Sequence, residues 1–308
     1  MCGVFWCSSH GQPNWKALVT PSVDLLVVLH NGRERIPAFL ESLKKVSVPL
    51  TAYFLDNDSR DGTPDLLANR VHELPFPAYV LRSSRNNGFA SGVNLLSHQS
   101  RGEFMFLLNP DTVLEEGCLE RLLERAVSDD RIAVCEARQS PREHPKSYDA
   151  ATGETTWCSG AALLIRREAF EDVGEFDDRL YFMYCEDVDL SWKLWLSGWK
   201  CMYVRDAVVN HFTQDLAAGK RRTLENYFSF RNSLFLFYRF GRRKDRLLLR
   251  EFLLKRFASS KYSIRSKALF AIALLDHIRY IPYLLQTKDS WRNREHAWVR
   301  LEETSLFR

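Results

Sequence analysis

The sequence predicts an α/β protein with a mostly parallel sheet. Short apolar runs alternate with amphipathic helical stretches, as at Val23–Leu29 (VDLLVVL) followed by the stripe Ile36, Phe39, Leu40 and Leu43. A run such as VDLLVVL is typical of a strand buried on both faces. Strand followed by helix, repeated, indicates βαβ units. Turn-forming residues such as Asp61-Gly62 separate the segments.

The remaining elements follow in order along the chain. Further strands are expected at 52–55, 79–81, 104–108, 132–135 and 161–165, and helices at 63–74, 90–99, 119–126 and 187–197. Thr63 before Pro64 predicts a helix N-cap, and Gly198 predicts a helix end. The polar segment 139–156 is expected to be a loop.

Composition restricts the classes of protein. Hydrophobic residues make up 45% and charged residues 27% of 308, which is ordinary for a globular chain. Seven irregularly spaced cysteines do not form a disulfide framework, and the first residues lack the pattern of a secretory signal. The sequence therefore predicts a cytoplasmic protein, placed at the inner face of the cytoplasmic membrane if its rear segment binds lipid.

Charge divides the chain into an acidic front and a basic rear. Residues 218–308 hold 21 Lys and Arg against 8 Asp and Glu, whereas residues 1–217 carry a net charge of −9. We expect an N-terminal tail over 1–20, a catalytic domain over 21–217 and a helical basic extension over 218–308. In the tail, Cys2, Cys7 and His10 offer three zinc ligands, but a structural site needs four, so an ordinary tail is the alternative.

Carboxylates follow the predicted strands at the edge where open α/β sheets bind ligands. They lie in FLDNDSRDG (Asp56, Asp58), in FLLNPDT (Asp111, with the amide of Asn109 two residues before it) and in YFMYCEDVDL (Glu186, Asp187, Asp189). Carboxylates near a polyanion require a divalent cation between them, and one at a helix start could act as a general base. Taken singly, each motif is also an ordinary turn or helix cap. Their occurrence at successive strand ends favours a site.

These motifs together resemble the family-2 glycosyltransferases with the GT-A fold, in particular the rhamnosyltransferase-like branch. The resemblance covers Val23 to Tyr238 and is carried by VVLHN, LDNDSRDGT, NNGFASGVN, LLNPDT, CSGAALLIRR, FMYCEDVDLS and Asn210-His211. It implies an inverting, metal-dependent transferase that moves a sugar from a nucleotide-diphosphate sugar (UDP or dTDP) to a hydroxyl of a glycan or lipid-linked acceptor. Cell-surface polysaccharide synthesis is the implied setting.

The resemblance also implies roles for particular residues. Asp187 matches the base, with Glu186 beside it, and Asp111 and His211 match ligands of Mg²⁺ or Mn²⁺. The expected nucleotide-sugar contacts are Leu29, Asn31, Asp56, Asp58, Asn86, Gly88, Phe89, Asn94 and Asn109. Residues expected near the donor sugar or acceptor are Ser159, Gly160, Asp189 and Trp192, although core packing is the alternative for the tryptophan. Asn109 replaces the first aspartate of the usual D-x-D, which leaves its role open.

Alternatives from other classes remain open at this stage. One is a non-catalytic GT-A scaffold, which is favoured only by the departure of Asn109 from the usual D-x-D motif. Another is a sugar nucleotidyltransferase, which would need a longer Gly- and Arg-rich loop after the first strand. The aromatic, basic helices at 226–257 suit an anionic membrane surface, and packing on the sheet or a homo-oligomer is the alternative. No nucleic-acid motif accompanies the basic residues.

Overall fold

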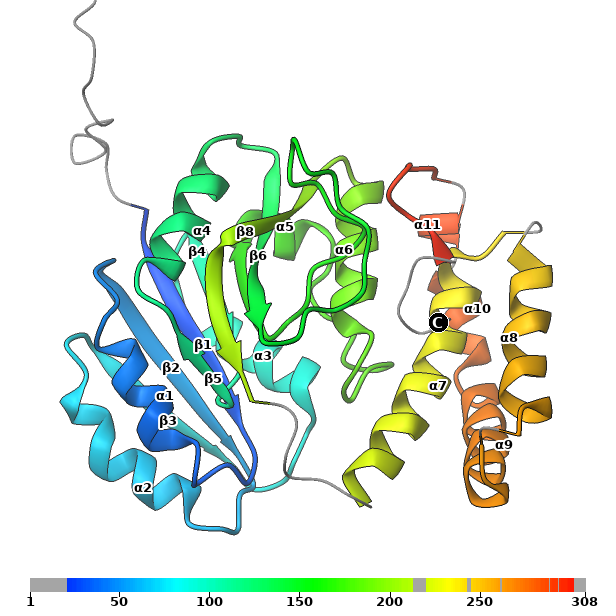
Figure 1. The fold of residues 1–308 in the computed structure, drawn as a ribbon, viewed down its shortest axis with the longest axis horizontal. Helices are drawn as coiled ribbons and strands as arrows, with labels where there is room; N and C mark the ends of the chain where they lie inside the picture. The colour runs from blue at the N-terminus through cyan, green and yellow to red at the C-terminus, as the bar shows by residue number, and fades with distance from the viewer. Residues whose placement is uncertain are drawn as a thin grey trace, which may run out of the picture.

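One mixed sheet forms the centre of the molecule (Figure 1). The computed structural model describes residues 21–212 and 220–301, apart from 243, 244, 261, 288 and 293. In this part of the chain an eight-stranded sheet has the order β3-β2-β1-β4-β7-β6-β8-β5. Its strands are β1 (Val23–Leu29), β2 (Leu50–Asn57), β3 (Ala78–Ser83), β4 (Phe104–Leu108), β5 (Thr112–Leu114), β6 (Ile132–Ser140), β7 (Ala162–Arg166) and β8 (Lys200–His211).

Helices connect the strands and continue beyond the sheet. Those of the sheet domain are α1 (Ile36–Leu43), α2 (Thr63–Arg70), α3 (Phe89–Gln99), α4 (Cys118–Val127), α5 (Arg167–Asp172) and α6 (Glu186–Leu196). Those of the C-terminal part are α7 (Lys220–Phe240), α8 (Arg246–Ala258), α9 (Ile264–Ile278), α10 (Ile281–Thr287) and α11 (Asp289–Arg292). The domain boundary predicted near residue 217 lies outside the described residues.

The sequence pattern explains how the sheet is buried on both faces. Along β1, Val23, Leu25, Val27 and Leu29 join one apolar core, and Leu26 between them joins the other. This alternation arises because successive side chains of a strand point to opposite faces. One core includes α1, α2 and α4, and the other includes α3, α5 and α6. Because both faces of the sheet are covered, its central strands need apolar residues at successive positions, as predicted for this fold class.

The order of strands departs from a purely parallel sheet at β7. The pairs among β1, β2, β3 and β4 are parallel, whereas β7 is antiparallel to both β4 and β6. β8, which had not been expected, pairs in parallel with β6 through a register shift near Ala137. The exposed charged residues Arg205 and Asp206 interrupt its apolar pattern at that irregularity, which hides the strand in the sequence.

Two predictions about the second helix are wrong in detail. Helix α2 ends at Arg70 and a short 3-10 turn follows, and Gly62, with φ 82°, is the N-cap in place of Thr63. The Thr63 hydroxyl instead donates to Asp61 (2.6 Å) and accepts from the Gly32 N–H (3.0 Å). It thereby ties the loop after β1 to the loop after β2.

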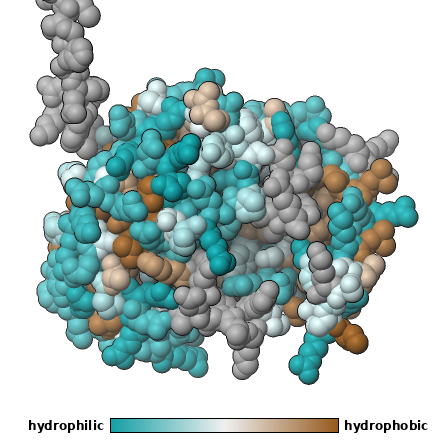
Figure 2. Space-filling model, viewed as in Figure 1, coloured by the Kyte–Doolittle hydropathy of each residue, from teal (hydrophilic) through white to brown (hydrophobic). Residues whose placement is uncertain are grey.

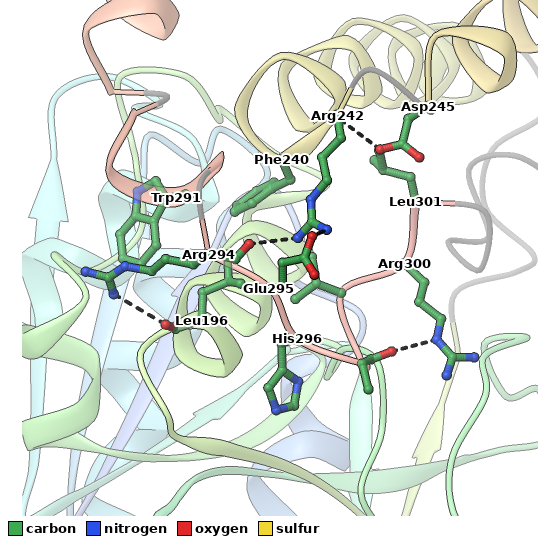
Figure 3. Close-up of a pocket in the computed structure, with 12 residues that line it drawn as sticks. Leu196, Phe240, Arg242, Asp245, Trp291, Arg294, Glu295, His296, Arg300 and Leu301 are labelled. Atoms are coloured by element: carbon green, nitrogen blue, oxygen red, sulfur yellow. Dashed lines mark hydrogen bonds and ion pairs between the residues drawn. The ribbon is translucent and has the colours of Figure 1, made fainter.

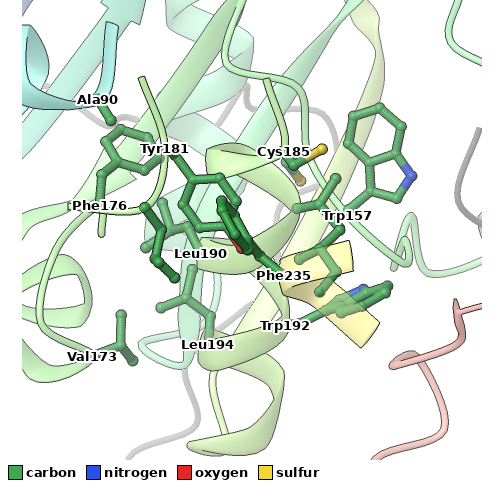
Figure 4. Packing of buried hydrophobic residues seen from close by; sticks show 14 of the residues in the cluster. Ala90, Trp157, Val173, Phe176, Tyr181, Cys185, Leu190, Trp192, Leu194 and Phe235 are labelled. Carbon is green, nitrogen blue, oxygen red and sulfur yellow. The ribbon is translucent and has the colours of Figure 1, made fainter. Parts of the chain in front are cut away.

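The C-terminal helices share a core with the sheet domain. Trp192 of α6 packs edge-on against Phe240 of α7, with ring centroids 5.2 Å apart. Tyr181 and Phe235 of α7 also pack edge-on, with ring centroids 6.0 Å apart (Figure 4). In Figure 1, α7 lies between the sheet domain and the outer helices α8 and α9. The extension is consequently part of the structure that supports α6.

Candidate functional site

The loops after β1 and β2 hold two residues in left-handed backbone conformations. Asn31 has φ 53° and Asp58 has φ 64°, and non-glycine residues adopt such angles rarely. The exposed Asn31 side chain accepts from the Arg60 backbone N–H at 2.8 Å, and the Asn31 backbone N–H donates to the Ser59 hydroxyl at 2.9 Å. The two loops therefore fix each other, and strained backbone of this kind often marks ligand sites.

Asn57, which the sequence analysis did not single out, organises the next loop. Its side-chain amide donates to the Asn86 Oδ1 at 3.1 Å and the Gly88 carbonyl at 2.9 Å, and its Oδ1 accepts from the Asn87 N–H at 3.0 Å. The side chain is fully buried among these partners. Its place between the two aspartates of Asp-Asn-Asp could have indicated the role, since a buried amide at a strand end requires several partners.

Asp56 ends β2 with a carboxylate that is only partly satisfied. The residue is 4% exposed; its Oδ2 accepts a long 3.4 Å bond from the Ser59 N–H, while Oδ1 has no protein partner. A buried oxygen without a partner costs free energy unless a ligand supplies a donor. Asp56 therefore fits its predicted place beside the nucleotide.

Two predicted nucleotide contacts point elsewhere. The Leu29 side chain is fully buried in the core, and the Asn94 amide is bonded to the backbone of Phe176 through a donated bond of 2.8 Å and an accepted bond of 3.3 Å. The prediction is wrong for these side chains, because the packing of β1 and α3 directs them inward. Phe89 is partly buried, and its ring lies 3.3 Å from the place that a Cβ on Gly160 would take.

Asp111 and His211 meet across a pair of short strands. The β5–β8 pairing sets Thr112 opposite His211, and the Phe212 N–H donates to the Asp111 carbonyl at 3.0 Å. The His211 Nε2 lies 3.2 Å from the Asp111 Oδ1, and Nδ1 lies 2.7 Å from the Gln139 Oε1. The sequence assigned both residues to a metal, and the fold brings them together although they are 100 positions apart.

The hydrogen bonds of His211 fit a cation ligand. Because Gln139 offers an oxygen to Nδ1, that nitrogen carries the proton and Nε2 presents its lone pair towards Asp111. Nε2 is buried and makes no hydrogen bond. Two acceptors 3.2 Å apart repel each other unless a proton or a cation lies between them. Histidine ligands commonly donate their second N–H in this way, so Gln139 has the place of an outer-shell partner.

A divalent cation at this point would have few protein ligands. Among the described residues, no group of three or more His, Cys, Asp and Glu side chains is arranged to hold a metal. Mg²⁺ and Mn²⁺ readily take one or two carboxylate or imidazole ligands together with phosphate oxygens and water. The pair therefore fits a cation that binds together with a diphosphate.

Asp187 is positioned in the first turn of α6, facing the backbone before β7. Its Oδ2 accepts from the Gly160 N–H at 3.2 Å, and Oδ1 accepts from the Val188 N–H at 2.9 Å. The next residue of that backbone, Ala161, accepts from the Asn109 N–H at 2.9 Å. The predicted base and the turn that carries Asp111 are thus connected through one short backbone segment.

The two carboxylates at the start of α6 differ in environment. Glu186 is buried, its Oε2 has no partner, and burial together with the charge of Asp187 raises the pKa of Glu186 well above the ordinary value. Burial also raises the pKa of Asp187, against the lowering effect of its hydrogen bonds from Gly160 and Val188. Asp187 is the more exposed of the two residues and is therefore the better candidate to reach a ligand and exchange a proton.

A strained turn aims these carboxylates and is held by α7. Tyr184 and Cys185 both have left-handed backbones, with φ 67° and 71°. The side-chain amide of Asn232 on α7 donates to the carbonyls of Met183 (2.8 Å) and Tyr184 (2.7 Å). Sequence analysis missed Asn232; an amide in an otherwise aromatic stretch, YFSFRNSLFLF, was the available signal.

A buried ion pair supports the same backbone from the other side. Glu136 of β6 accepts from the Ser159 N–H at 2.9 Å and forms a salt bridge with Lys146, which comes from the loop after β6. The Lys146 ammonium also lies over the Trp157 ring, 4.9 Å from its centroid. Its positive charge lowers the pKa of Asp187 against the effect of burial. Ser159 is thereby fixed through its backbone, and its side chain is buried.

Two residues predicted near the sugars lie in the core instead. Trp192 is fully buried against Phe240, and Asp189 is 1% exposed, with Arg239 donating to it at 2.6 Å and Tyr181 at 3.1 Å. The prediction that they face a sugar is wrong because both lie on the side of α6 that packs against α7. Asp189 links α6 to the extension.

A separate cavity of about 420 Å³ lies between α6 and the C-terminal segment (Figure 3). Three arginines line it, but their charged groups already have partners: Arg242 pairs with Glu295, Arg294 donates to the Leu196 carbonyl and Arg300 to the Ala297 carbonyl. None of the predicted site residues lines this cavity. It is distinct from the edge that carries Asp111 and Asp187.

Comparison with known proteins agrees with this arrangement. Residues 24–176 match the family model described as Glycosyl transferase family 2. The chain belongs to this family, is a glycosyltransferase and is similar to its rhamnosyltransferases. It is 29% identical over 240 residues, which cover 63% of the chain and 76% of the relative, to an N-acetylglucosaminyl-diphospho-decaprenol L-rhamnosyltransferase of Mycobacterium tuberculosis.

Shorter matches and solved structures extend the comparison. A 60-residue stretch is 42% identical to Rhamnosyltransferase WbbL of Escherichia coli, covering 20% of this chain and 22% of that one. A mannosyltransferase of Pyrobaculum calidifontis, solved with GDP-Man and Mn²⁺, matches with a TM-score of 0.57 and 16% identity over 88% of this chain and 74% of that one. TarS of Staphylococcus aureus matches with a TM-score of 0.56 and 16% sequence identity, over 87% of this chain and 83% of that one. The GT-A fold predicted from sequence is confirmed.

Proposed function

We propose that the protein is an inverting glycosyltransferase that moves a sugar from a nucleotide-diphosphate sugar to an alcohol, with Asp187 as the base. The observation that carries this proposal is the position of Asp187. The residue is partly buried, and its carboxylate is fixed by two backbone N–H groups and connected through Gly160 and Ala161 to the turn of Asp111. A base held at a fixed distance from the proposed diphosphate site, with room for the sugar between them, suits direct displacement.

The reaction is a single displacement. The acceptor oxygen bonds to the anomeric carbon, the bond from that carbon to the diphosphate oxygen breaks, and Asp187 accepts the hydroxyl proton. Because the base and the leaving group lie on opposite sides of the sugar, the configuration inverts. The raised pKa of Asp187 makes its carboxylate a stronger proton acceptor than an ordinary aspartate.

Asp111 and His211 are proposed to hold Mg²⁺ or Mn²⁺ at the diphosphate. A cation there supplies positive charge to the departing nucleotide diphosphate. Gln139 keeps the proton of His211 on Nδ1 and so leaves Nε2 available. The solved mannosyltransferase neighbour contains Mn²⁺ with its nucleotide sugar, which supports a cation of this class. Asn109, beside them, would stay uncharged.

The nucleotide is proposed to lie over the ends of β1 and β2. The exposed Asn31, the unpartnered Oδ1 of Asp56, and the loop of Asn86 and Gly88 line this edge, with Asp58 at its rim. A UDP- or dTDP-sugar is the expected donor. The name of the mycobacterial relative suggests a rhamnosyl donor and a sugar carried on a polyprenyl diphosphate as acceptor.

Two measurements on the full chain test this function. A thermal-shift panel with uridine, thymidine and guanosine diphosphates, each with and without Mn²⁺, should show stabilisation that needs both the diphosphate and the metal. Nuclear magnetic resonance of the product should then give the opposite anomeric configuration to that of the donor. Absence of both nucleotide binding and donor hydrolysis would instead indicate a non-catalytic scaffold, and retained configuration would exclude single displacement.

A further inference from the structure

The outward side of α9 is apolar although its inward side is already packed. Inward, Phe270 and Ala273 are fully buried, and Phe270 stacks on Phe230 of α7 with centroids 4.9 Å apart. Outward, the exposed fractions are 87% for Ile264, 56% for Ile272, 66% for Leu275 and 51% for Ile278. A helix that is apolar all round is usually covered by lipid or protein on both sides.

The neighbouring helix continues this surface. Leu247 and Leu254 of α8 are 73% and 54% exposed. We call these six residues, Leu247, Leu254, Ile264, Ile272, Leu275 and Ile278, the C-terminal apolar face. The outer helices α8 and α9 lie on the far side of α7 from the sheet (Figure 1), and Figure 2 shows hydrophobic side chains along that edge of the molecule. Contiguous exposed apolar surface of this kind marks an interaction site.

Basic side chains surround the C-terminal apolar face. Arg250 and Lys255 of α8, and Arg265 and Arg279 at the two ends of α9, are exposed. Residues 246–287 contain eight Lys and Arg and two acidic residues. Both acids are already paired: Glu251 with Lys255 at 2.7 Å, and Asp276 with Arg231 at 3.0 Å. The surface therefore carries excess positive charge around an apolar centre.

We propose that the C-terminal apolar face docks on the surface of an anionic lipid bilayer. Leucine and isoleucine would enter the boundary between headgroups and acyl chains, and the basic side chains would extend to the lipid phosphates. Each basic residue near such a surface strengthens binding roughly five-fold. A second copy of this chain is a poorer occupant, because it would bring two positively charged rims together.

The helices are suited to lie on the bilayer. Among the described residues no single helix has the length and hydropathy to cross a membrane. Helices α9 and α10, bent by 57° at their junction, would have both if taken together. The inner side of α9 is occupied by α7, which leaves the outer side for lipid. Arg265 and Arg279 at the ends of the helix would both reach headgroups in this orientation.

Docking at this face would place the transferase where a lipid-linked acceptor is found. The same extension holds the turn before Asp187 through Asn232, so the docked helices and the proposed base belong to one packed unit. The proposal rests on the proposed function only for the lipid-linked nature of the acceptor. Binding to lipid is a property of the surface and can be measured without any transfer.

Flotation with vesicles tests the proposal. The full chain is mixed with vesicles of phosphatidylcholine alone or of equimolar phosphatidylcholine and phosphatidylglycerol. We expect binding to the anionic vesicles, weakened at least about ten-fold in Ile272→Glu/Leu275→Glu. Val127→Glu, at an apolar position of α4 that is 48% exposed, is the control and should bind as the parent does. Arg265→Gln/Arg279→Gln should reduce binding to the anionic vesicles only.

Several outcomes would overturn the proposal. The first is failure of the parent chain to float with anionic vesicles, and the second is unchanged binding of Ile272→Glu/Leu275→Glu. The third is a parent chain that forms a dimer which this double variant dissociates, because the face would then bind a second copy. Donor hydrolysis in detergent-free buffer separates the two proposals. A variant that no longer floats but still hydrolyses the donor affects docking alone, whereas a parent that floats without hydrolysing the donor contradicts only the proposed activity.

Discussion

Arg239 of α7 donates a 2.6 Å hydrogen bond to Asp189 of α6, and both side chains are almost wholly buried. The same guanidinium pairs with Asp177, which precedes α6. A buried ion pair of this kind fixes geometry more than it adds stability, because desolvation offsets most of the attraction. Here it fixes the extension against the helix that begins with the predicted base.

Removing one partner of this pair should be costly. Arg239→Ala leaves buried Asp177 without its salt bridge and Asp189 with Lys193 alone, 3.6 Å away, so we expect a loss of about 3 kcal/mol in the free energy of unfolding. Urea unfolding followed by circular dichroism measures it. Lys255→Ala, which removes an exposed partner of Glu251, should cost no more than about 0.5 kcal/mol. Equal effects for the two variants would contradict the assigned role of Arg239.

The neighbouring carboxylates should respond differently to amide substitution. Asp187→Asn removes the proposed base and should lower kcat by about 10²–10⁴. Glu186→Gln mimics the neutral form that its raised pKa favours, so kcat should stay within about ten-fold of the parent. Turnover with saturating donor and acceptor measures both. A fully active Asp187→Asn variant would remove that residue from the chemistry.

The charge of Lys146 should control the pH dependence of transfer. A base works only when deprotonated, so kcat/KM falls as pH drops through the pKa of Asp187. Lys146 lowers that pKa, and Lys146→Met should therefore move the acidic fall in kcat/KM to higher pH. Lys146→Met/Glu136→Gln removes two buried charges with opposite effects on the pKa of Asp187, so its profile should shift less than that of Lys146→Met. The exposed Lys45→Met is the control, and an unshifted profile in Lys146→Met would refute the coupling.

The hydrogen bond from His211 to Gln139 should strengthen metal binding. Gln139→Leu removes the acceptor for Nδ1 and should weaken Mn²⁺ affinity by about 10–100-fold, whereas Gln139→Glu keeps an acceptor and should retain binding. Asp111→Ala should abolish metal-dependent binding of the nucleotide diphosphate. Titration calorimetry with Mn²⁺ and the diphosphate measures these affinities. Gln99→Leu, at an exposed glutamine of α3, should have no effect; unchanged affinity in Gln139→Leu would show that the contact is merely structural.

Gly88 should tolerate no side chain. It has φ 86°, and a Cβ there would lie 2.3 Å from the Phe182 carbonyl oxygen, next to the turn that leads to Glu186. Gly174 has a similar φ of 77° with open space around it, so Gly174→Ala measures the backbone cost alone, about 1 kcal/mol. Gly88→Ala should cost at least about 1 kcal/mol more and also lower kcat. Thermal unfolding checks the first expectation, and similar losses in the two variants would contradict the steric argument.

The sequence by itself determined the sheet domain and most of the predicted site. The strand Val23–Leu29 and the helices α1 and α3 follow from local periodicity, and the residues after each strand converge because parallel strands end at one edge. The motif order was enough to identify the family. Asp111 and His211 could be paired from sequence only through the family resemblance.

Only the tertiary structure decided which side of α6 faces Gly160 and which side packs against α7. Asp187 and Asp189 are two positions apart and chemically alike in sequence, yet one faces Gly160 and the other pairs with Arg239. The partners Asn57, Gln139, Lys146 and Asn232 come from distant segments, and no local pattern records which polar group a buried side chain will meet. The reason is physical: local periodicity reports which residues are buried, whereas contacts between distant segments depend on how the elements pack in three dimensions.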